Sequence, residues 1–535
     1  MVSSLLADAL ANPTAVLEDL FDPNAVLDAF PARVSAHFST VFAPRDALNE
    51  IPPLSPSSPP EIHQNRALVR FRAMIQDTSP SPQMYLARRK HALCGGWGLG
   101  ADDATDRDDS IDYADLRECT VVWAVSVPGE SSWCSTALDG TSVSTGHATH
   151  RALSPHKFPM PDASHVGAQI KIYESRRTGE SLKATDLYTF VGILTSEPLH
   201  ADLELAHPPF VPTLHVVFSQ PVRTTIVPRE YPLASPTTSE LRDELIAWIA
   251  DTSLAGDRDA AEWVLLCGIA RVQSRTPPIL PLTLTLSRFP SPPSKTDIST
   301  NPTLSHVLSL LFPVLNILPL SLNTLNATSF APESKNEDLH SGWLQLPSGS
   351  VCLLTESGVT EGKVSERGLQ NLRAAQEMMN AQTLEYVFPY SRFEFNTDVA
   401  FVVLTEGKRS AFFQTNVTIP LKPAKSAMEF DFYRDGSDVA LPSPQKLEMF
   451  RALVGGAKIG NVSIGVKTAE FIQEDFVKER QAASSPSDAL SSDDLIHRMM
   501  LARLLALSLH ETEISVAVWE KAKALDTRRK TRISQ

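Results

Sequence analysis

The spacing of apolar residues changes sharply between residues 260 and 296. In residues 260–272 apolar side chains cover nearly the whole circumference of a helix. This pattern predicts an interior helix that is stopped by the prolines beginning at Pro277, because proline cannot continue the hydrogen-bond ladder. In residues 280–286 apolar and polar positions alternate, which predicts a strand. Together these elements predict an α/β domain, and we place it at residues 236–440.

The loop after this strand lacks the residues that hold a nucleotide phosphate. A cradle of the G-x-x-x-x-G-K-[ST] type needs glycines, whose backbone N–H groups approach the phosphates, and a lysine that neutralises them. Residues 287–296 contain no glycine, and their three prolines have no N–H to donate. Lys295 and Thr296 could be a remnant of the motif, but an ordinary polar loop is the better interpretation. The pattern predicts the frame of a nucleotide hydrolase without a cofactor-binding site.

Residues 1–50 show short helical patterns separated by prolines. An apolar residue recurs every four positions from Val26 to Phe38 and would form one stripe, although Pro31 must kink or restart that helix. We expect an N-terminal helical segment that packs on its own chain, in preference to a free helix that docks on a partner.

A Pro/Ser-rich linker, residues 51–61, precedes a β-rich region at residues 62–228. The linker's composition is not expected to pack a core. Strand-like alternation occupies five short runs, at residues 67–75, 121–127, 169–173, 187–195 and 213–218. Loops 99–118 and 135–166 interrupt them. Short strands with long loops suit a small OB-like barrel and, nearly as well, a sandwich.

One cysteine and several histidines gather in and beside the second loop. Their spacings match no structural zinc pattern, and the segment has the composition of disordered chain, so we predict no metal ligands among them. The residues concerned are Cys134, His147, His150, His156 and His165.

The C-terminal region, residues 441–535, has helical patterns at residues 444–454, 468–482, 492–509 and 515–528. Ser491 or Ser492 is expected to cap the third helix, with two aspartates complementing the dipole of its first turn. The basic stretch from Lys521 to Arg532 predicts either a nuclear signal or a solvated helix end.

Composition narrows the class of partner and compartment. A net charge of −14 argues against a strongly basic nucleic-acid binder and favours partners with basic surfaces. Five cysteines without C-x-x-C spacing indicate neither a disulfide framework nor a zinc ribbon. The N-terminus has no basic n-region, and the longest apolar stretch, residues 307–320, is broken by prolines and too short for a bilayer. We therefore expect a soluble intracellular protein with no membrane segment.

Two short blocks in the β-rich region make the chain recognisable. The block F-R-x-M-I-Q-D places Phe71, Met74, Gln76 and Asp77, and the block V-P-G-E-S-x-W places Pro128, Gly129, Glu130 and Trp133. Both resemble the signature of the mini-chromosome maintenance (MCM) complex-binding protein family. Further matches at residues 171–174, 186–194 and 502–529 extend the resemblance over nearly the whole chain, apart from the two loops. These eight residues are our candidate site, with an interface or a structural role.

The local chemistry of the blocks allows more modest interpretations. Trp133 fits a core or hairpin position better than a ligand platform. Arg70 and Arg72 would share the polar face of the first strand, where they could follow a phosphate backbone, although a solvated face is the simpler interpretation.

The α/β region resembles the AAA+ module of MCM helicases in a degenerate form. Residues 342–356 are similar to the stretch that leads into the Walker B strand, which normally ends in Asp-Glu, but here Thr355 takes the Asp place and only Glu356 remains. Residues 384–405 are similar to the pre-sensor hairpin and sensor strand, with Arg392 as a weak counterpart of the DNA-contacting basic residue. The hairpin aromatics Tyr386, Phe388, Phe393 and Phe395 are expected to build core. The C-terminal helices resemble the lid of such a module.

The resemblance implies a multidomain α/β protein: an N-terminal helical segment, a β-rich OB-like domain, a degenerate AAA+-like (MCM-like) α/β domain without Walker A, and a C-terminal helical lid. It implies a non-enzymatic nuclear protein that binds MCM helicase subunits, with indirect chromatin association. It also implies a role in MCM complex assembly or unloading, in DNA replication and in sister chromatid cohesion. We expect no catalytic residue, cofactor, metal or small-molecule substrate. The alternatives are a weak ATPase of degenerate AAA+ type that depends on Glu356, and a DNA-binding OB-type module that acts through Arg70 and Arg72.

Overall fold

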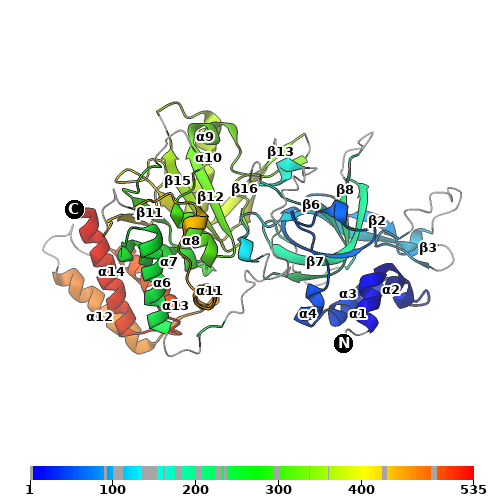
Figure 1. The fold of residues 1–535 in the computed structure, drawn as a ribbon, viewed down its shortest axis with the longest axis horizontal. Coiled ribbons are helices and arrows are strands. Elements are labelled where there is room, and N and C mark those ends of the chain that lie inside the picture. The colour runs from blue at the N-terminus through cyan, green and yellow to red at the C-terminus, as the bar shows by residue number, and fades with distance from the viewer. Residues whose placement is uncertain are drawn as a thin grey trace.

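The computed structural model of the chain describes residues 4–89, 93–99, 112–134, 154–160, 163–174, 182–200, 208–222, 230–233, 238–292, 300–336, 338–359, 361–424, 430–482 and 491–534. Four residues singled out above, His147, His150, Lys295 and Thr296, lie outside these ranges, as does much of loops 99–118 and 135–166. The described chain forms two parts side by side along the long axis, with the N-terminal and β-rich regions in one and the rest in the other (Figure 1). It is a mixed α/β fold with several sheets.

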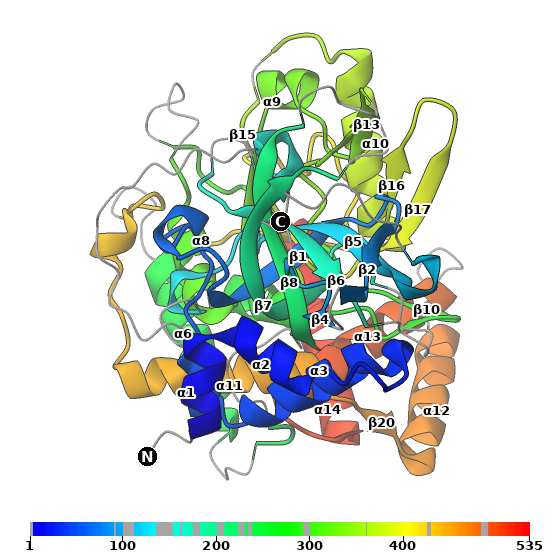
Figure 2. The same cartoon turned by 90° about the vertical axis from the view of Figure 1, so that its right-hand side faces the viewer.

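The N-terminal helices pack beneath the β-rich region, as Figure 2 shows. Phe30, Val34 and Phe38 are buried against Val191 and Phe218 of the strands above, which confirms packing on the same chain. Val26 is 71% exposed and does not belong to the predicted stripe, because a new helix starts at Phe30 with proline in its first turn. The helices are α1 (Ser4–Ala11), α2 (Pro13–Leu20), α3 (Phe30–Val41) and α4 (Arg45–Asn49).

The β-rich region is a closed barrel, not a sandwich. Its pairings run β1–β7–β8–β6–β5 and return to β1, so five strands form a ring in which only the β6–β8 contact is parallel. Each strand sends alternate apolar residues inward. The ring strands are β1 (Leu68–Asp77), β5 (Leu116–Ser126), β6 (Gly167–Ile172), β7 (Leu187–Pro198) and β8 (Phe210–Pro221); β2 (Gln83–Leu86) adds to β5, and β3 (Arg88–Arg89) pairs with β4 (Leu93–Cys94).

The expectation that residues 51–61 do not pack into a core is wrong for their first part. Ile51 and Leu54 are buried, and the backbone there exchanges hydrogen bonds with Arg70: Arg70 N donates to Pro52 O at 3.0 Å, and Leu54 N donates to Arg70 O at 2.8 Å. Two apolar residues spaced three apart were enough to bind this stretch to the barrel despite its prolines.

The α/β region is a parallel five-stranded sheet in the order β12-β15-β18-β11-β19. Successive residues of the central strands enter opposite cores: Val351 and Leu353 face α6–α8, whereas Cys352 and Leu354 face α9 and α10. The strands are β11 (Leu284–Ser287), β12 (Leu315–Ser321), β15 (Ser350–Gly358), β18 (Val399–Leu404) and β19 (Val417–Pro420), and the helices are α6 (Thr238–Ser253), α7 (Arg258–Ile269), α8 (Thr303–Leu311), α9 (Leu322–Ala327) and α10 (Glu366–Ala381).

The interior helix predicted at residues 260–272 is confirmed as α7. Every residue from Ala260 to Ile269 except Glu262 is buried. The helix ends at Ile269, well before Pro277, so the prolines do not stop it. The strand predicted at residues 280–286 is β11, which is shorter and begins at Leu284.

A second sheet projects from the α/β region beside the barrel, in the order β14-β13-β16-β17. It consists of β13 (Glu333–Lys335), β14 (Asp338–His340), β16 (Thr383–Val387) and β17 (Arg392–Asn396), and a small pair is formed by β9 (Ser274–Arg275) and β10 (Pro278–Ile279).

The C-terminal helices share one continuous core with the parallel sheet. Leu501, Leu505 and Trp519 are buried in the same cluster as α7 and the strands β11 and β18. Ser491 is the N-cap of α13 and forms a capping box with Asp494, as one of the two predicted candidates. The elements are α11 (Pro444–Ile459), α12 (Val466–Ala482), α13 (Ser492–Ser508) and α14 (Val516–Ser534), with β20 (Ser463–Ile464) paired to β21 (Glu513–Ile514).

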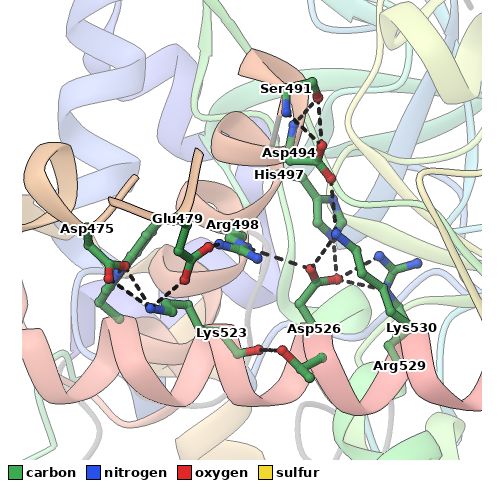
Figure 3. A network of polar contacts seen from close by, with 12 residues as sticks. Asp475, Glu479, Ser491, Asp494, His497, Arg498, Lys523, Asp526, Arg529 and Lys530 are labelled. Atoms are coloured by element: carbon green, nitrogen blue, oxygen red, sulfur yellow. Dashed lines mark hydrogen bonds and ion pairs between the residues drawn. The ribbon is translucent and has the colours of Figure 1, made fainter. Parts of the chain in front are cut away.

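Ion pairs hold the outer helix α12 to α13 and α14 (Figure 3). The Lys523 ammonium lies 2.8 Å from Asp475 and 2.7 Å from Glu479, and the Arg498 guanidinium lies 2.6 Å from Glu479. The basic end of α14 is paired too, through Arg528, Arg529, Lys530 and Arg532, so these four side chains are not simply solvated.

We expect Lys523→Ala to loosen α12, because the described part of that helix buries little besides Ile472 and depends on these charges. The free energy that holds α12 in place should fall by about 1 kcal/mol, and amide exchange over residues 466–482 should become faster. High salt should produce the same faster exchange in the wild type. Hydrogen exchange followed by mass spectrometry measures both effects. Lys478→Ala is the control, since its pair with Glu474 is exposed; equal exchange in the two variants would contradict the prediction.

Candidate functional site: the seam between the barrel and the α/β domain

Both recognisable blocks lie where the barrel meets the α/β region. Strands β1 and β5 pair antiparallel, with Ala73 opposite Ser126, so the start of the first block and the turn that contains the second are neighbours. We call this contact the seam: residues 76–77, 127–134 and 155–158 of the barrel part against residues 309–316, 338–345 and Tyr386 of the α/β part. None of the eight candidate residues is exposed.

The second block binds the edge of the parallel sheet. Ser131 N donates to Pro313 O at 2.9 Å, Ser131 Oγ donates to Phe312 O at 2.6 Å, and Leu315 N donates to Gly129 O at 2.9 Å. Glu130 also forms an antiparallel bridge with Val314. The turn thereby covers the start of β12, a sheet edge whose backbone groups otherwise lack a strand partner.

Gly129 permits this approach. Its φ is +73°, and a Cβ atom there would lie 2.4 Å from Asn316 Oδ1 and 2.6 Å from Leu315 O. Pro128 before it is buried and fixes the entry into the turn.

Trp133 is half-buried in the seam, so the core or hairpin position predicted for it is wrong. Its indole Nε1 donates to Ser309 O at 2.8 Å, and the Arg451 guanidinium lies 4.1 Å from the ring centroid. Arg451 Nε donates to Leu310 O at 2.8 Å. The cation–π contact therefore joins α11 to the barrel turn, and one hydrogen bond from each partner joins both to α8.

The interpretation of Arg70 and Arg72 as a solvated face is also wrong. Arg70 is 6% exposed, and its Nε donates to Ile51 O at 3.0 Å. Arg72 forms an ion pair at 2.9 Å with Glu130 of the second block, with 12% of its side chain exposed. Both guanidinium groups bind other groups of the protein, so neither is available to contact a phosphate backbone.

The first block reaches the α/β region through Gln76. Gln345 Nε2 donates to Gln76 O at 2.7 Å, and the Tyr386 hydroxyl donates to the same oxygen at 3.1 Å. Burial raises the pKa of Tyr386 well above its usual value, so the hydroxyl stays a donor. Of the other residues of this block, Met74 packs beside Val314 in the seam and Phe71 lies in the barrel interior.

Asp77 holds a buried lysine at the seam. Its Oδ2 lies 3.3 Å from Lys157 Nζ, which also lies 2.5 Å from Asp338 Oδ1, and both Asp77 and Lys157 are about 4–5% exposed. The lysine therefore bridges carboxylates from the two parts of the chain.

The expectation that the hairpin aromatics build core holds only in part: Phe395 packs, partly buried, against the core cluster beside α10. Phe393 is 61% exposed and Tyr390 at the tip is fully exposed, while Tyr386 stacks on Phe395 with ring centroids 4.7 Å apart. Arg392 is an exposed residue paired with Glu385 at 3.1 Å. The period-two pattern identified a strand correctly, but it could not say that this hairpin extends outward from the domain.

The place after β11, where a phosphate cradle would begin, is filled by protein contacts. Arg288 N and Phe289 N donate to Gly407 O and Thr405 O at 3.0 and 2.9 Å, and the buried Phe289 ring packs edge-on to Phe432. These two N–H groups are therefore not offered to a ligand.

Thr355 and Glu356 lie within β15, 7% and 8% exposed. Glu356 Oε1 accepts from the Ser410 hydroxyl at 2.5 Å and Oε2 accepts from Ala411 N at 3.1 Å. The carboxylate thus anchors the backbone after β18 instead of facing an open site.

The three described residues of this group, Cys134, His156 and His165, do not form a metal-binding cluster with one another. Cys134 Sγ contacts Pro313 O at 3.6 Å, and the His165 ring stacks on Phe158 with centroids 4.2 Å apart. His156, however, meets Asp338 and His340 of β14, which the sequence could not indicate because His156 and Asp338 are separated by 182 positions.

Comparison with known proteins shows one family along the chain. A family model described as "Mini-chromosome maintenance replisome factor" matches residues 38–157 and 139–533, which include both sides of the seam. A protein of Arabidopsis thaliana named mini-chromosome maintenance complex-binding protein is 24% identical over 93% of this chain and 92% of its own length. Proteins with the same name from Gallus gallus (24% identical, 99% of this chain and 98% of theirs) and Drosophila melanogaster (25%, 88% and 90%) are similar. Among the described residues, no helix combines the length and apolar character needed to cross a bilayer.

Proposed function

We propose that this chain, which belongs to the mini-chromosome maintenance replisome factor family, binds the MCM complex, and does so without enzymatic activity. The observation that carries the proposal is the match of the family model along nearly the whole chain, together with relatives that are named for binding that complex. The partner class is therefore a protein, the MCM helicase subunits.

The fold supports a mechanism based on shape. The closed barrel suits the OB-like expectation, and the parallel sheet with helices on both faces suits a degenerate AAA+-like, MCM-like module with a C-terminal lid. A module of this outline can present a subunit-like surface to an MCM subunit and occupy the place of a neighbour.

The contacts around β11 and β15 support a non-enzymatic role. The N–H groups of Arg288 and Phe289 and the carboxylate of Glu356 are all bonded to backbone or side-chain groups of the protein. Without nucleotide between it and its neighbour, the module cannot drive a ring through an ATP cycle. Regulation of MCM complex assembly or unloading in replication and cohesion would follow from competition for an interface, in the nucleus and with indirect association to chromatin.

Co-purification of the full chain with MCM subunits, with and without ATP, tests the proposal. We expect binding that is indifferent to ATP and unchanged by Lys295→Ala and Glu356→Ala. ATP turnover by the purified protein that Glu356→Ala abolishes would establish the alternative, a weak ATPase, and loss of subunit binding in that variant would also contradict the proposal.

The DNA-binding alternative has less support, because Arg70 is buried and hydrogen-bonded to Ile51 and Arg72 is largely buried and paired with Glu130. A salt titration of duplex DNA binding by the full chain should show no more than weak, nonspecific affinity.

A further inference from the structure

Three side chains with metal-binding chemistry meet at the rim of the seam. His156, Asp338 and His340 each offer one ligand atom, and these atoms all lie within 4.8 Å of one another. His156 Nε2 lies 2.6 Å from Asp338 Oδ2, and the two imidazole rings are 4.3 Å apart between centroids. The side chains of His156 and Asp338 are 34% and 37% exposed, so an ion from solvent can reach them.

Backbone structure holds the three groups together before any ion arrives. Asp338 and His340 are two residues apart on β14, so both side chains leave the same face of that strand. His156 lies in the short 3-10 turn Pro155–Lys157, whose carbonyl at His156 accepts from Ser341 N at 2.8 Å. This hydrogen bond fixes the distance between the two histidine backbones.

The neighbouring charges leave one carboxylate oxygen for an ion. Lys157 Nζ lies 2.5 Å from Asp338 Oδ1 and 3.3 Å from Asp77 Oδ2. Asp77 therefore balances part of the ammonium charge. Asp338 Oδ2 contacts His156 Nε2. A metal ion could take the place of the proton that these two atoms share. Two imidazoles and one carboxylate are a donor set that suits Zn²⁺ and related first-row ions, whereas Mg²⁺ and Ca²⁺ prefer oxygen ligands alone.

We propose that His156, Asp338 and His340 form a divalent transition-metal site, with Zn²⁺ as the fitting ion, which links the barrel to the α/β domain. The three side chains supply three ligands, and the fourth position of a tetrahedral ion is left to water. Since His156 belongs to one part of the chain and the other two ligands to the second part, the bound ion stabilises the seam directly.

Zn²⁺ titration of the chelator-treated full chain, followed by calorimetry, tests this site. We expect one equivalent that is lost or weakened at least tenfold in His156→Ala and in His340→Ala and retained in His63→Ala, a control that removes a histidine elsewhere. Thermal unfolding should show a Zn²⁺-dependent increase in Tm in the wild type and the control only. X-ray absorption of the loaded protein should report two imidazole ligands.

His340→Gln provides a second variant if an alanine variant does not fold, because glutamine keeps a side chain of similar size without the imidazole nitrogen. Binding that is equally tight in the His156 and His340 variants would overturn the proposal. Zn²⁺ bound only at several weak surface sites, or coordinated without imidazole, would overturn it as well.

Discussion

Gly129→Ala is expected to separate the barrel from the α/β domain, with a loss of about 3 kcal/mol in the stability of their contact. Two physical effects add. A residue with a Cβ atom loses about 1–2 kcal/mol in a left-handed backbone conformation, and Gly129 has a φ of +73°. In addition, that Cβ would lie 2.6 Å from Leu315 O, a backbone atom that can move only if β12 moves. Urea unfolding followed by tryptophan fluorescence should become two separate transitions, with faster proteolysis between the two parts.

Gly256→Ala is the matched control for this prediction. Gly256 has a φ of +83°, but the nearest atom to an added Cβ is Ala424 Cβ at 3.2 Å, in place of a backbone oxygen. This variant should lose only about 1 kcal/mol, from backbone conformation alone. If both variants unfold alike, the close contact of Gly129 with β12 does not hold the seam together.

Glu197→Gln is expected to destabilise the barrel by about 3 kcal/mol or more, because it leaves a buried ammonium without its counter-charge. Glu197 forms an ion pair with Lys171, and its other oxygen lies 2.8 Å from His215 Nε2. His215 Nδ1 is in turn 2.7 Å from the Tyr173 hydroxyl. Lys171 is 6% exposed, so water cannot take over the solvation that the carboxylate provides. Chemical denaturation of the full chain measures the loss.

The same carboxylate predicts how stability depends on acid. Burial alone would raise the pKa of Glu197, but the hydrogen bonds and charges of His215 and Lys171 outweigh it and lower the pKa to about 2. A carboxyl group with a depressed pKa in the folded state stabilises the protein above its unfolded pKa, near 4.5, and this contribution is lost as pH falls towards 2. The wild type should therefore lose stability over this window, and Glu197→Gln should lose less.

Glu385→Gln tests whether the loss of stability expected for Glu197→Gln follows from removing any paired glutamate. Its partner Arg392 is 64% exposed, so the change should alter stability by about 0.5 kcal/mol or less. A loss in Glu197→Gln no larger than in Glu385→Gln would mean that Lys171 finds another partner.

Periodicity predicted the elements of this chain well where apolar side chains surround a helix or where both faces of a strand are buried. The α7 helix and strands β1 and β7 were found at nearly their observed positions, since their burial depends on their own sequence. The same reasoning failed for Arg70 and Arg72: a basic residue on a strand is normally read as facing water, whereas here Ile51 and Glu130 from distant positions cover that face.

The contacts of the candidate site could not be predicted from one sequence. The two blocks marked Gln76 and Gly129 as special, but their partners lie far along the chain, as with Trp133 and Ser309, separated by 176 positions. Local pattern carries no information about such pairs, and it gave no sign of Asp338 and His340. Resemblance to a family drew attention to the two blocks, and the structure shows which residues they contact.

The continuous core beneath the C-terminal helices has a mechanical consequence. A lid that swings in response to a bound nucleotide needs a hinge. The face of the lid that packs on the domain must also be able to separate from it without exposing large apolar side chains. Here such a swing would bring Trp519 and Leu505 into water together with the face of α7 that they cover. We therefore expect the helices and the sheet to move together as one body, which keeps the contour of their common surface constant.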